Sequence, residues 1–303
     1  MLLRGIRVID ISRLLPGGYC TQVLAEQGAE VTKVESPSGD PLRAMPGGAA
    51  FFDALHRGKR LVTLDLRSDE GRTAFLARMT DADVLVEGFR PGVMERFGLG
   101  YATLAAINPA IVYCAITGYG STGSLAGRAG HDLNYLARSG ALSLMPRADG
   151  RPVIPGLQVA DLAGGLQAAF LIGAALVERA RTGRGSRIEV SMAELMRSWT
   201  SLPRAARRAG LSGLPLTGEV PCYRVYAVSD GFLTVAALER DFWTEFCASI
   251  GRPDLAERQF DPSAVEEVQS VLAPLSRADW IKRFGQQDVC VEAVLSLEES
   301  EPS

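Results

Sequence analysis

The sequence predicts an α/β protein, with a large domain on a Rossmann-like parallel sheet and a smaller α+β domain. Two observations predict this class. Apolar runs with strand periodicity alternate with helical stretches in the first part of the chain, and the pattern later changes to a hairpin followed by helices. We therefore place the large domain at 1–195, a linker at 196–218 and the small domain at 219–303.

The chain opens with the pattern of a βαβ unit. Residues 6–11 form a strand, the Pro-Gly-Gly run at 16–18 turns the chain, and residues 19–27 have helical spacing. Gly28 is suited to end this helix, and 29–35 form the next strand. Parallel strands joined by a helix require a right-handed crossover, which favours a parallel sheet.

The remaining elements follow the same alternation. We expect further strands at 61–66, 84–87, 111–116 and 187–192, and helices at 70–80 and 161–180. A glycine-rich loop at 118–123 follows one of these strands, where α/β proteins place ligands. In the small domain we expect a hairpin of strands 223–228 and 232–236, then helices around 242–250 and 280–284.

Composition excludes several functional classes. The net charge is −3, from 32 basic and 35 acidic residues, which argues against a nucleic-acid partner. Two histidines exclude a three-histidine metal site, and five cysteines without CxxC spacing indicate reduced thiols in an intracellular protein. The chain opens without a secretory signal, and its longest apolar stretch, 162–177, is shorter than a membrane span. We expect no metal, no membrane span and a cytoplasmic location.

A dinucleotide site is one alternative for the first strand and helix. Glu35 ends the second strand, where an acid that binds ribose would stand. The turn at 15–19 reads Leu-Pro-Gly-Gly-Tyr and lacks the G-x-G-x-x-G spacing that brings a pyrophosphate to the helix start. This departure counts against a nicotinamide or flavin cofactor.

Three titratable residues are candidates for catalysis. His131 follows a glycine that lets a ligand approach, and histidine titrates near neutral pH, although a lone histidine is more often structural. Asp161 interrupts an apolar run; it is either the cap of the following helix or a partly desolvated acid, base or nucleophile. Glu239 starts a helix of the small domain and by itself is typical of a solvated acid.

Two basic segments lie beside glycines, at 57–60 and at Arg90. Cations in such positions are suited to phosphate groups, and a solvated loop is the alternative explanation.

Four motifs give the chain a family resemblance. The E-G-F-R-P-G-V-M-E-R-F-G run at 87–98 and the R-G-K-R and T-L-D-L runs within 57–66 resemble signatures of the family III CoA transferases. The G-H-D-L-N-Y run at 130–135 and the A-D-L-A-G-G run at 160–165 are similar to motifs of a branch of that family, the α-methylacyl-CoA racemases. The similarity covers nearly the whole chain.

The resemblance implies an interlocked homodimer whose active site lies between one chain's large domain and the other's small domain. It implies an acyl-CoA thioester as substrate, with no separate cofactor. Phosphates would meet Arg90 and Lys59, the adenine would lie along 63–66, and the pantetheine and thioester would lie beside 130–135. The expected CoA-binding residues are Arg43, Lys59, Arg60, Thr63, Leu64, Asp65, Leu66, Arg90, Gly130, Asp132, Asn134 and Tyr135.

The racemase branch implies a two-base mechanism. His131 and Asp161 would exchange the α-proton of a (2R)- or (2S)-2-methylacyl-CoA from opposite faces, through an enolate. Backbone N–H groups at the start of the Asp161 helix would stabilise the enolate oxygen, and Glu239 of the partner subunit would fix the histidine tautomer. In the transferase branch Asp161 attacks the thioester and forms a mixed anhydride. His131 favours the racemase; a CoA transferase and a non-catalytic CoA binder are the alternatives.

Three departures from the racemase pattern stand out. The racemases carry D-R-P after the second strand and use that arginine for CoA, whereas this chain has E-S-P at 35–37, which leaves Arg43 as the substitute. Their G-G-A-P turn is Gly-Glu-Val-Pro at 218–221, where the glutamate would alter the pocket for the acyl tail. Family members usually continue further and return to the large domain, so we expect a weakened dimer or exposed apolar surface here.

Overall fold

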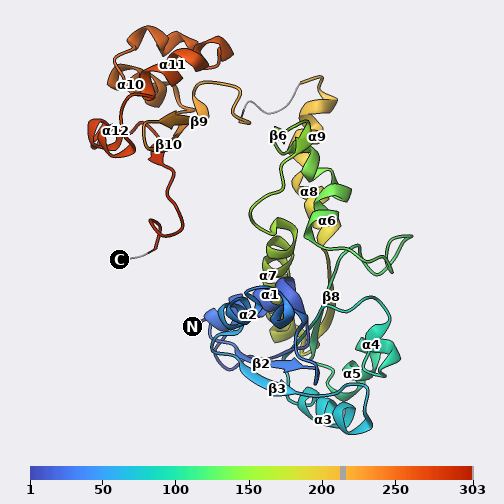
Figure 1. The fold of residues 1–303 in the computed structure, drawn as a ribbon. Coiled ribbons are helices and arrows are strands. Elements are labelled where there is room, and N and C mark those ends of the chain that lie inside the picture. Colours follow the sequence, from blue (N-terminus) through green and yellow to red (C-terminus); the bar gives the residue numbers. More distant parts are fainter. Residues whose placement is uncertain (212–215, 302–303) are drawn as a thin grey trace. The chain divides into compact units, whose positions relative to one another are not determined.

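Two compact units make up the chain, Met1–Leu202 and Pro203–Ser303. A computed structural model describes residues 1–211 and 216–301. The boundary between the units falls inside the segment 196–218 that the sequence suggests as a linker, and the first part of this segment is helical (Figure 1). The helix α9, Ser201–Arg208, contains the boundary.

A six-stranded sheet forms the frame of the first unit (Figure 1). Its order is β3-β2-β1-β4-β5-β8, and all neighbouring pairs are parallel. The strands are β1 Arg7–Asp10, β2 Glu30–Glu35, β3 Arg60–Thr63, β4 Val84–Glu87, β5 Val112–Thr117 and β8 Ser186–Ser191. This order confirms the predicted α/β class and the Rossmann-like sheet. The direction of the connections reverses between β1 and β4, where doubly wound sheets bind ligands.

Helices cover both faces of the sheet. They are α1 Leu14–Glu26, α2 Gly48–His56, α3 Asp69–Met79, α4 Val93–Arg96, α5 Tyr101–Ile107, α6 Asp132–Ser139, α7 Val159–Thr182 and α8 Met192–Trp199. Shorter pieces are the 3-10 turns η1 Pro41–Ala44 and η2 Ala141–Leu144 and the hairpin of β6 Arg147–Ala148 with β7 Arg151–Pro152.

Successive strand residues point to opposite faces of the sheet, and both faces are buried. One face carries Val8, Val84 and Val112 and packs with α1 and α7. The other face carries Ile9 and Leu85 and packs with α3, α4 and α5. This double burial explains why the strands appear in the sequence as nearly continuous apolar runs.

The start of α1 differs from the prediction. The run 16–18 was expected as a turn, but α1 begins at Leu14 and includes it. Proline is tolerated in the first turn of a helix because its missing N–H has no partner there. The glycines serve close packing: a Cβ on Gly17 would lie 2.2 Å from the Cβ of Ser12, and one on Gly18 would lie 2.4 Å from Leu55.

The long helix α7 has a small-residue side and a bulky side. Ala160, Ala168 and Ile172 are buried in the core, whereas Phe170 and Val177 are 68% and 66% exposed. By length and composition alone α7 could cross a membrane. In the structure it packs along α1 and β5.

The second unit has its own sheet and core. Strands β9 Tyr223–Val228, β10 Gly231–Ala236 and β11 Val291–Ala293 form an antiparallel sheet in the order β11-β10-β9. The helices are α10 Arg240–Ser249, α11 Val265–Leu272 and α12 Arg277–Phe284, with the 3-10 turns η3 Pro253–Arg258 and η4 Pro262–Ala264. The hairpin and two helices match the prediction, while β11 and α11 were missed. This unit is α+β, as the sequence predicts.

Candidate active site

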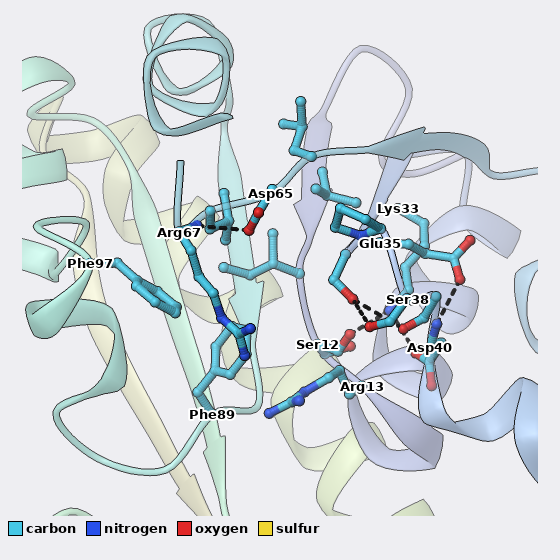
Figure 2. A pocket seen from close by; sticks show the side chains of 17 residues that line it. Ser12, Arg13, Lys33, Glu35, Ser38, Asp40, Asp65, Arg67, Phe89 and Phe97 are labelled. Atoms are coloured by element: carbon cyan, nitrogen blue, oxygen red, sulfur yellow. Dashed lines mark hydrogen bonds and ion pairs between the residues drawn. The ribbon is translucent and has the colours of Figure 1, made fainter. Parts of the chain in front are cut away.

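A cavity of about 290 Å³ opens at the carboxyl ends of β1, β2, β3 and β4 (Figure 2). Residues 11–13, 33–40 and 64–67 form its wall, together with Phe89 and Phe97. The cavity therefore lies where the connections of the sheet reverse. Leu64, Asp65 and Leu66, three of the predicted CoA-binding residues, are part of this wall.

Two arginines in the wall of this cavity were missed by sequence reasoning. Arg13 is the N-cap residue of α1, and its guanidinium lies 4.8 Å from the centre of the Phe89 ring. Arg67 follows β3 in the same loop as Asp65, whose carboxylate accepts the backbone N–H of Arg67 at 3.0 Å. Figure 2 shows both guanidinium groups directed toward Phe89. The available signal was their position in the loops that follow β1 and β3.

The other nine predicted CoA-binding residues lie outside the wall of the cavity, and three of them belong to β3 or to the 3-10 turn after β2. Thr63 ends β3 and is exposed, next to the wall. Arg60 begins β3, so it stands at the opposite end of the strand from the cavity. Arg43 donates to both carboxylate oxygens of Glu35, at 2.9 and 3.0 Å, and lies over the ring of Phe52. Its guanidinium is therefore already engaged by the glutamate that replaces the racemase aspartate.

The expected role of Lys59 as a phosphate ligand is contradicted. Its side chain is fully buried, and its ammonium donates to the backbone oxygen of Gly18 and to Oγ1 of Thr21, each at 2.8 Å. The same nitrogen lies 3.1 Å from Nδ1 of His56 and 3.9 Å from Asp10. Burial lowers the pKa of Lys59 to about 8. The ammonium group of Lys59 therefore interacts with groups inside the protein.

A second buried lysine, Lys33, completes this interior cluster. Its ammonium donates to the backbone oxygen of Ser12 at 2.5 Å and lies 3.6 Å from Asp10 and 3.3 Å from Asp40. Burial alone would raise the pKa of Asp10, but Lys33, Lys59 and two hydroxyl donors outweigh it, so the pKa is lowered. Neither Lys33 nor Asp10 had been singled out from the sequence.

The G-H-D-L-N-Y motif forms the start of α6, and its polar side chains bind the protein itself. His131 is the N-cap residue; it is exposed, and its backbone N–H donates to Asn134 at 3.0 Å. The hydroxyl of Tyr135 donates to the backbone oxygen of Gly130 at 2.5 Å. Asp132 accepts the backbone N–H groups of residues 160 and 161, at 2.6 and 3.2 Å. Asn134, Tyr135 and Asp132 thus each have a partner within the protein, and their expected contacts with CoA stay a prediction.

Asp161 lies in the first turn of α7, beside the start of α6. It is not the N-cap residue, which is Gln158. Burial and the nearby charge of Asp132 raise the pKa of Asp161 to about 7. A carboxyl group with this pKa can both give and accept a proton near neutral pH. His131 precedes Asp132 in the sequence. The hydrogen bonds that Asp132 accepts from α7 therefore place the backbone of His131 at the same junction of α6 and α7.

The backbone N–H groups expected to stabilise an enolate are already used. The N–H groups of Ala160 and Asp161 donate to Asp132, and that of Leu162 donates to the backbone oxygen of Gln158 at 2.9 Å. These three groups are therefore not free for an enolate: the carboxylate of Asp132 engages two of them, and the backbone of α7 engages the third.

Arg90 is another of the predicted CoA-binding residues. It follows Phe89 in the loop after β4, and it is exposed. Burial and Asp161 raise the pKa of Tyr135 to about 12, and the charge of Arg90 acts on the same hydroxyl in the opposite sense. The loop is held by Glu87, whose carboxylate accepts the backbone N–H of Phe89 at 2.7 Å; burial raises the pKa of Glu87 to about 7.

Glu239 belongs to the second unit. It is the N-cap residue of α10, it is exposed, and its side chain makes no capping hydrogen bond. Within residues 1–211 and 216–301, no group of three or more His, Cys, Asp or Glu side chains is arranged to hold a metal ion.

The model of the CoA-transferase family III matches residues 3–302. The chain belongs to this family. Its similarity to curated members is substantial: it is 37% identical to the mouse alpha-methylacyl-CoA racemase over 99% of this chain and 79% of the relative. It is 36% identical to a succinyl-CoA:mesaconate CoA-transferase of Haloarcula hispanica, over 83% of this chain and 68% of the relative. Family III members with both kinds of activity are therefore similar to it.

Solved family III structures resemble the whole chain. A CAIB/BAIF family protein from Brucella suis superposes with a TM-score of 0.85 at 30% identity, covering 98% of this chain and 84% of that one. A Mycobacterium tuberculosis protein, Rv3272, gives the same TM-score at 30% identity, over 98% of this chain and 85% of that one. The family suggested by the sequence motifs is thereby confirmed, and the fold agrees with it.

Proposed function

We propose that this protein is an acyl-CoA racemase or epimerase that interconverts (2R)- and (2S)-2-methylacyl-CoA thioesters. The observation that carries the proposal is the junction of α6 and α7. His131 is the N-cap residue of α6, and its neighbour Asp132 accepts a hydrogen bond from the first turn of α7, where Asp161 has a pKa near neutrality. A racemase needs two groups that exchange a proton, and this junction supplies both.

The reaction follows from these two groups. One base takes the α-proton of the thioester, and its electron pair moves into an enolate. The other group, in its acid form, returns a proton to the opposite face of the same carbon. His131 and the Asp161 carboxyl take these two roles, and the roles exchange when the reaction runs in reverse. Proton balance is closed without a metal or a redox cofactor.

The route of the CoA moiety is part of the proposal. The nucleotide occupies the cavity at the carboxyl end of the sheet, with Arg13 and Arg67 close to its phosphates. The pantetheine passes Phe89 and Arg90 and brings the thioester to Asp161. Support comes from the contiguity of these residues: Phe89 lines the cavity, and the charge of the next residue acts on Tyr135 beside Asp161.

Proton exchange in heavy water tests this proposal. The protein is incubated with a 2-methylacyl-CoA, and deuterium at the α-carbon is followed by mass spectrometry. We expect exchange by the wild type and by Glu178→Ala, a change of an exposed acid later on α7. His131→Ala and Asp161→Ala should each lose it. A wild type that binds acyl-CoA without exchanging or transferring it would instead be a CoA-binding protein.

A CoA transferase is the second candidate, and the similarity to the Haloarcula enzyme favours it. In that reaction the Asp161 carboxylate attacks the thioester carbonyl and expels CoA thiolate, which leaves a mixed anhydride on the aspartate. CoA thiolate then forms an aspartyl-CoA thioester and releases the first acid. A second carboxylate repeats these steps in reverse. Transfer of CoA to a free acid, dependent on Asp161 and independent of His131, would establish this alternative.

We further propose that two copies of the chain form a dimer and that Glu239 of the partner subunit orients His131. The exposed side of α7, with Leu166, Phe170 and Val177, supports an association. The role of Glu239 rests on the resemblance alone. Light scattering after size exclusion measures the mass in solution, and Glu239→Gln should reduce exchange. A monomer with full exchange activity would contradict both parts.

A further inference from the structure

One carboxylate oxygen joins the two helices that carry the proposed acid and base. Oδ1 of Asp132, in the first turn of α6, accepts the backbone N–H of Ala160 at 2.6 Å and that of Asp161 at 3.2 Å. The N–H groups in the first turn of a helix have no partner within it. Asp132 supplies this partner from another helix and places a negative charge at the positive end of the α7 dipole.

The same residue is fixed on its own side. Asn134 binds the backbone N–H of His131, and Tyr135 binds the backbone oxygen of Gly130, so the chain on both sides of Asp132 is held. A displacement of the Asp132 carboxylate would therefore change the position of His131 relative to Asp161.

We propose that Asp132 is a positioning residue. Its carboxylate fixes the start of α7 against the start of α6, and its charge favours the protonated form of Asp161 that donates to the substrate carbon. This inference rests on the proposed function for its catalytic meaning, and its structural part stands independently. It replaces the role in CoA binding that the sequence motif suggested for this side chain.

The charges around Asp161 agree with this role. Asp132 and the phenol of Tyr135 face it from α6, and burial acts in the same direction as Asp132 by disfavouring a second negative charge. Arg90, in the loop after β4, acts on Tyr135. The pKa of Asp161, near 7, reflects burial first and Asp132 second.

Two substitutions separate the two parts of the proposal. Asp132→Asn keeps an oxygen acceptor for the α7 N–H groups and removes the charge. Asp132→Ala removes both. Glu178→Gln is the matched control, because it removes an exposed acid from the last part of α7. Thermal unfolding establishes that each variant is folded.

The first readout is the ionisation of Asp161, followed by carboxyl ¹³C NMR. In Asp132→Asn we expect its titration to move to lower pH by about one unit, and the pH profile of kcat to move in the same direction. In Asp132→Ala we expect kcat to fall about 100-fold with little change in KM, because the two groups lose their alignment. A merely structural role would leave the titration and the pH profile in place.

The second readout is amide hydrogen exchange at the start of α7. We expect protection of residues 160 and 161 in the wild type and in Asp132→Asn, and its loss in Asp132→Ala. An unchanged Asp161 titration in Asp132→Asn, or unchanged protection and kcat in Asp132→Ala, would overturn the proposal. The NMR titration of Asp161 and the amide exchange are both measured without the reaction, unlike kcat and its pH profile. A wild type without α-proton exchange would therefore contradict the proposed function and leave the role of Asp132 to be decided by the NMR and exchange data.

Discussion

Asp10 and Asp161 are both desolvated carboxylates near the carboxyl side of one sheet, and their surroundings are opposite. Asp10 lies within 3.9 Å of two lysine ammonium groups and accepts two hydroxyl hydrogen bonds, from Ser12 and Thr21. Asp161 has another carboxylate, that of Asp132, as its charged neighbour. Burial raises the pKa of both; the lysines reverse the shift at Asp10, and Asp132 increases it at Asp161.

The difference shows how two aspartates in one fold can have different functions. A compensated carboxylate stays ionised over the whole physiological range and holds elements together. An uncompensated one titrates near neutral pH and is available for proton transfer. The charge of the neighbour, more than burial itself, decides between the two.

Removing the uncompensated carboxyl should have the largest effect. Asp161→Asn is expected to lower the rate of α-proton exchange by about 10²–10⁴-fold, because an amide cannot give or take the proton. Mass spectrometry of deuterium incorporation measures it. The same substitution made at the exposed Glu178, as Glu178→Gln, should retain full activity. Retention of exchange by Asp161→Asn would contradict the assignment.

Removing a compensating charge should have the largest effect on stability. Lys33→Met leaves Asp10 and Asp40 without the ammonium that lies 3.6 and 3.3 Å away. Loss of one partner from a buried ion pair costs about 3–5 kcal/mol, measurable by urea unfolding. Lys282→Met, at an exposed position in the last turn of α12, is the control and should change the free energy of unfolding by less than about 0.5 kcal/mol.

The pH dependence of stability tests the comparison directly. The unfolded chain releases the Asp161 proton near pH 3.8, whereas the folded chain keeps it to about 7. The contribution of this group to stability is therefore full below pH 3.8 and is lost as the pH rises to 7. Asp161→Asn should remove this loss. Unfolding midpoints at pH 5 and pH 8 measure it, and an unchanged difference between them would exclude the raised pKa.

His56 should give the opposite slope in the same pH range. Burial, and then the charge of Lys59, lower its pKa from 6.5 to about 3. The unfolded chain therefore takes up a proton below pH 6.5 that the folded chain does not. Stability from this group is full above pH 6.5 and is lost toward pH 3, by up to about 1.4 kcal/mol per pH unit. Urea unfolding measures this between pH 7 and pH 5. The free energy of unfolding of His56→Asn should fall less over this range than that of the wild type. An equal fall in both proteins would contradict the lowered pKa of His56.

Substitution of the two exposed arginines in the cavity wall should have the smallest effect, and only on the binding of acyl-CoA. Arg13→Gln and Arg67→Gln should each raise the KM for acyl-CoA about 10-fold and leave kcat nearly unchanged, since a charge-assisted hydrogen bond contributes roughly 1.5–3 kcal/mol. Steady-state kinetics measure both constants. With an acyl-pantetheine, which lacks the nucleotide, the variants should match the wild type. A persistent difference there would show that the arginines act elsewhere.

Sequence reasoning predicted all six strands of the large sheet, most clearly β4 and β5, which are buried along their whole length and are mostly apolar. It missed the short helices, which lack a long helical period: α2, α4, α5, α6, α8, α9 and α11.

Side-chain direction was the part that could not be predicted. Lys59 stands in a basic run beside a glycine, as a phosphate ligand would, yet it points inward because Asp10 and Thr21 offer partners from other elements. Asp132 is in a motif suited to a ligand, yet it binds a helix 28 residues later. Both outcomes depend on contacts between segments that are distant in the sequence.

The positions of the cavity-lining residues in the sequence have a consequence for the order in which parts of the protein can fold during synthesis. Every residue that lines the cavity comes from positions 11–97, and the sheet face packed with α3, α4 and α5 is complete by residue 115. The opposite face, with Val8, Val84 and Val112, is fully covered only after α7, which begins at Val159, has been synthesised. During synthesis the apolar side chains of this face that pack against α7 therefore stay accessible to chaperones until α7 leaves the ribosome.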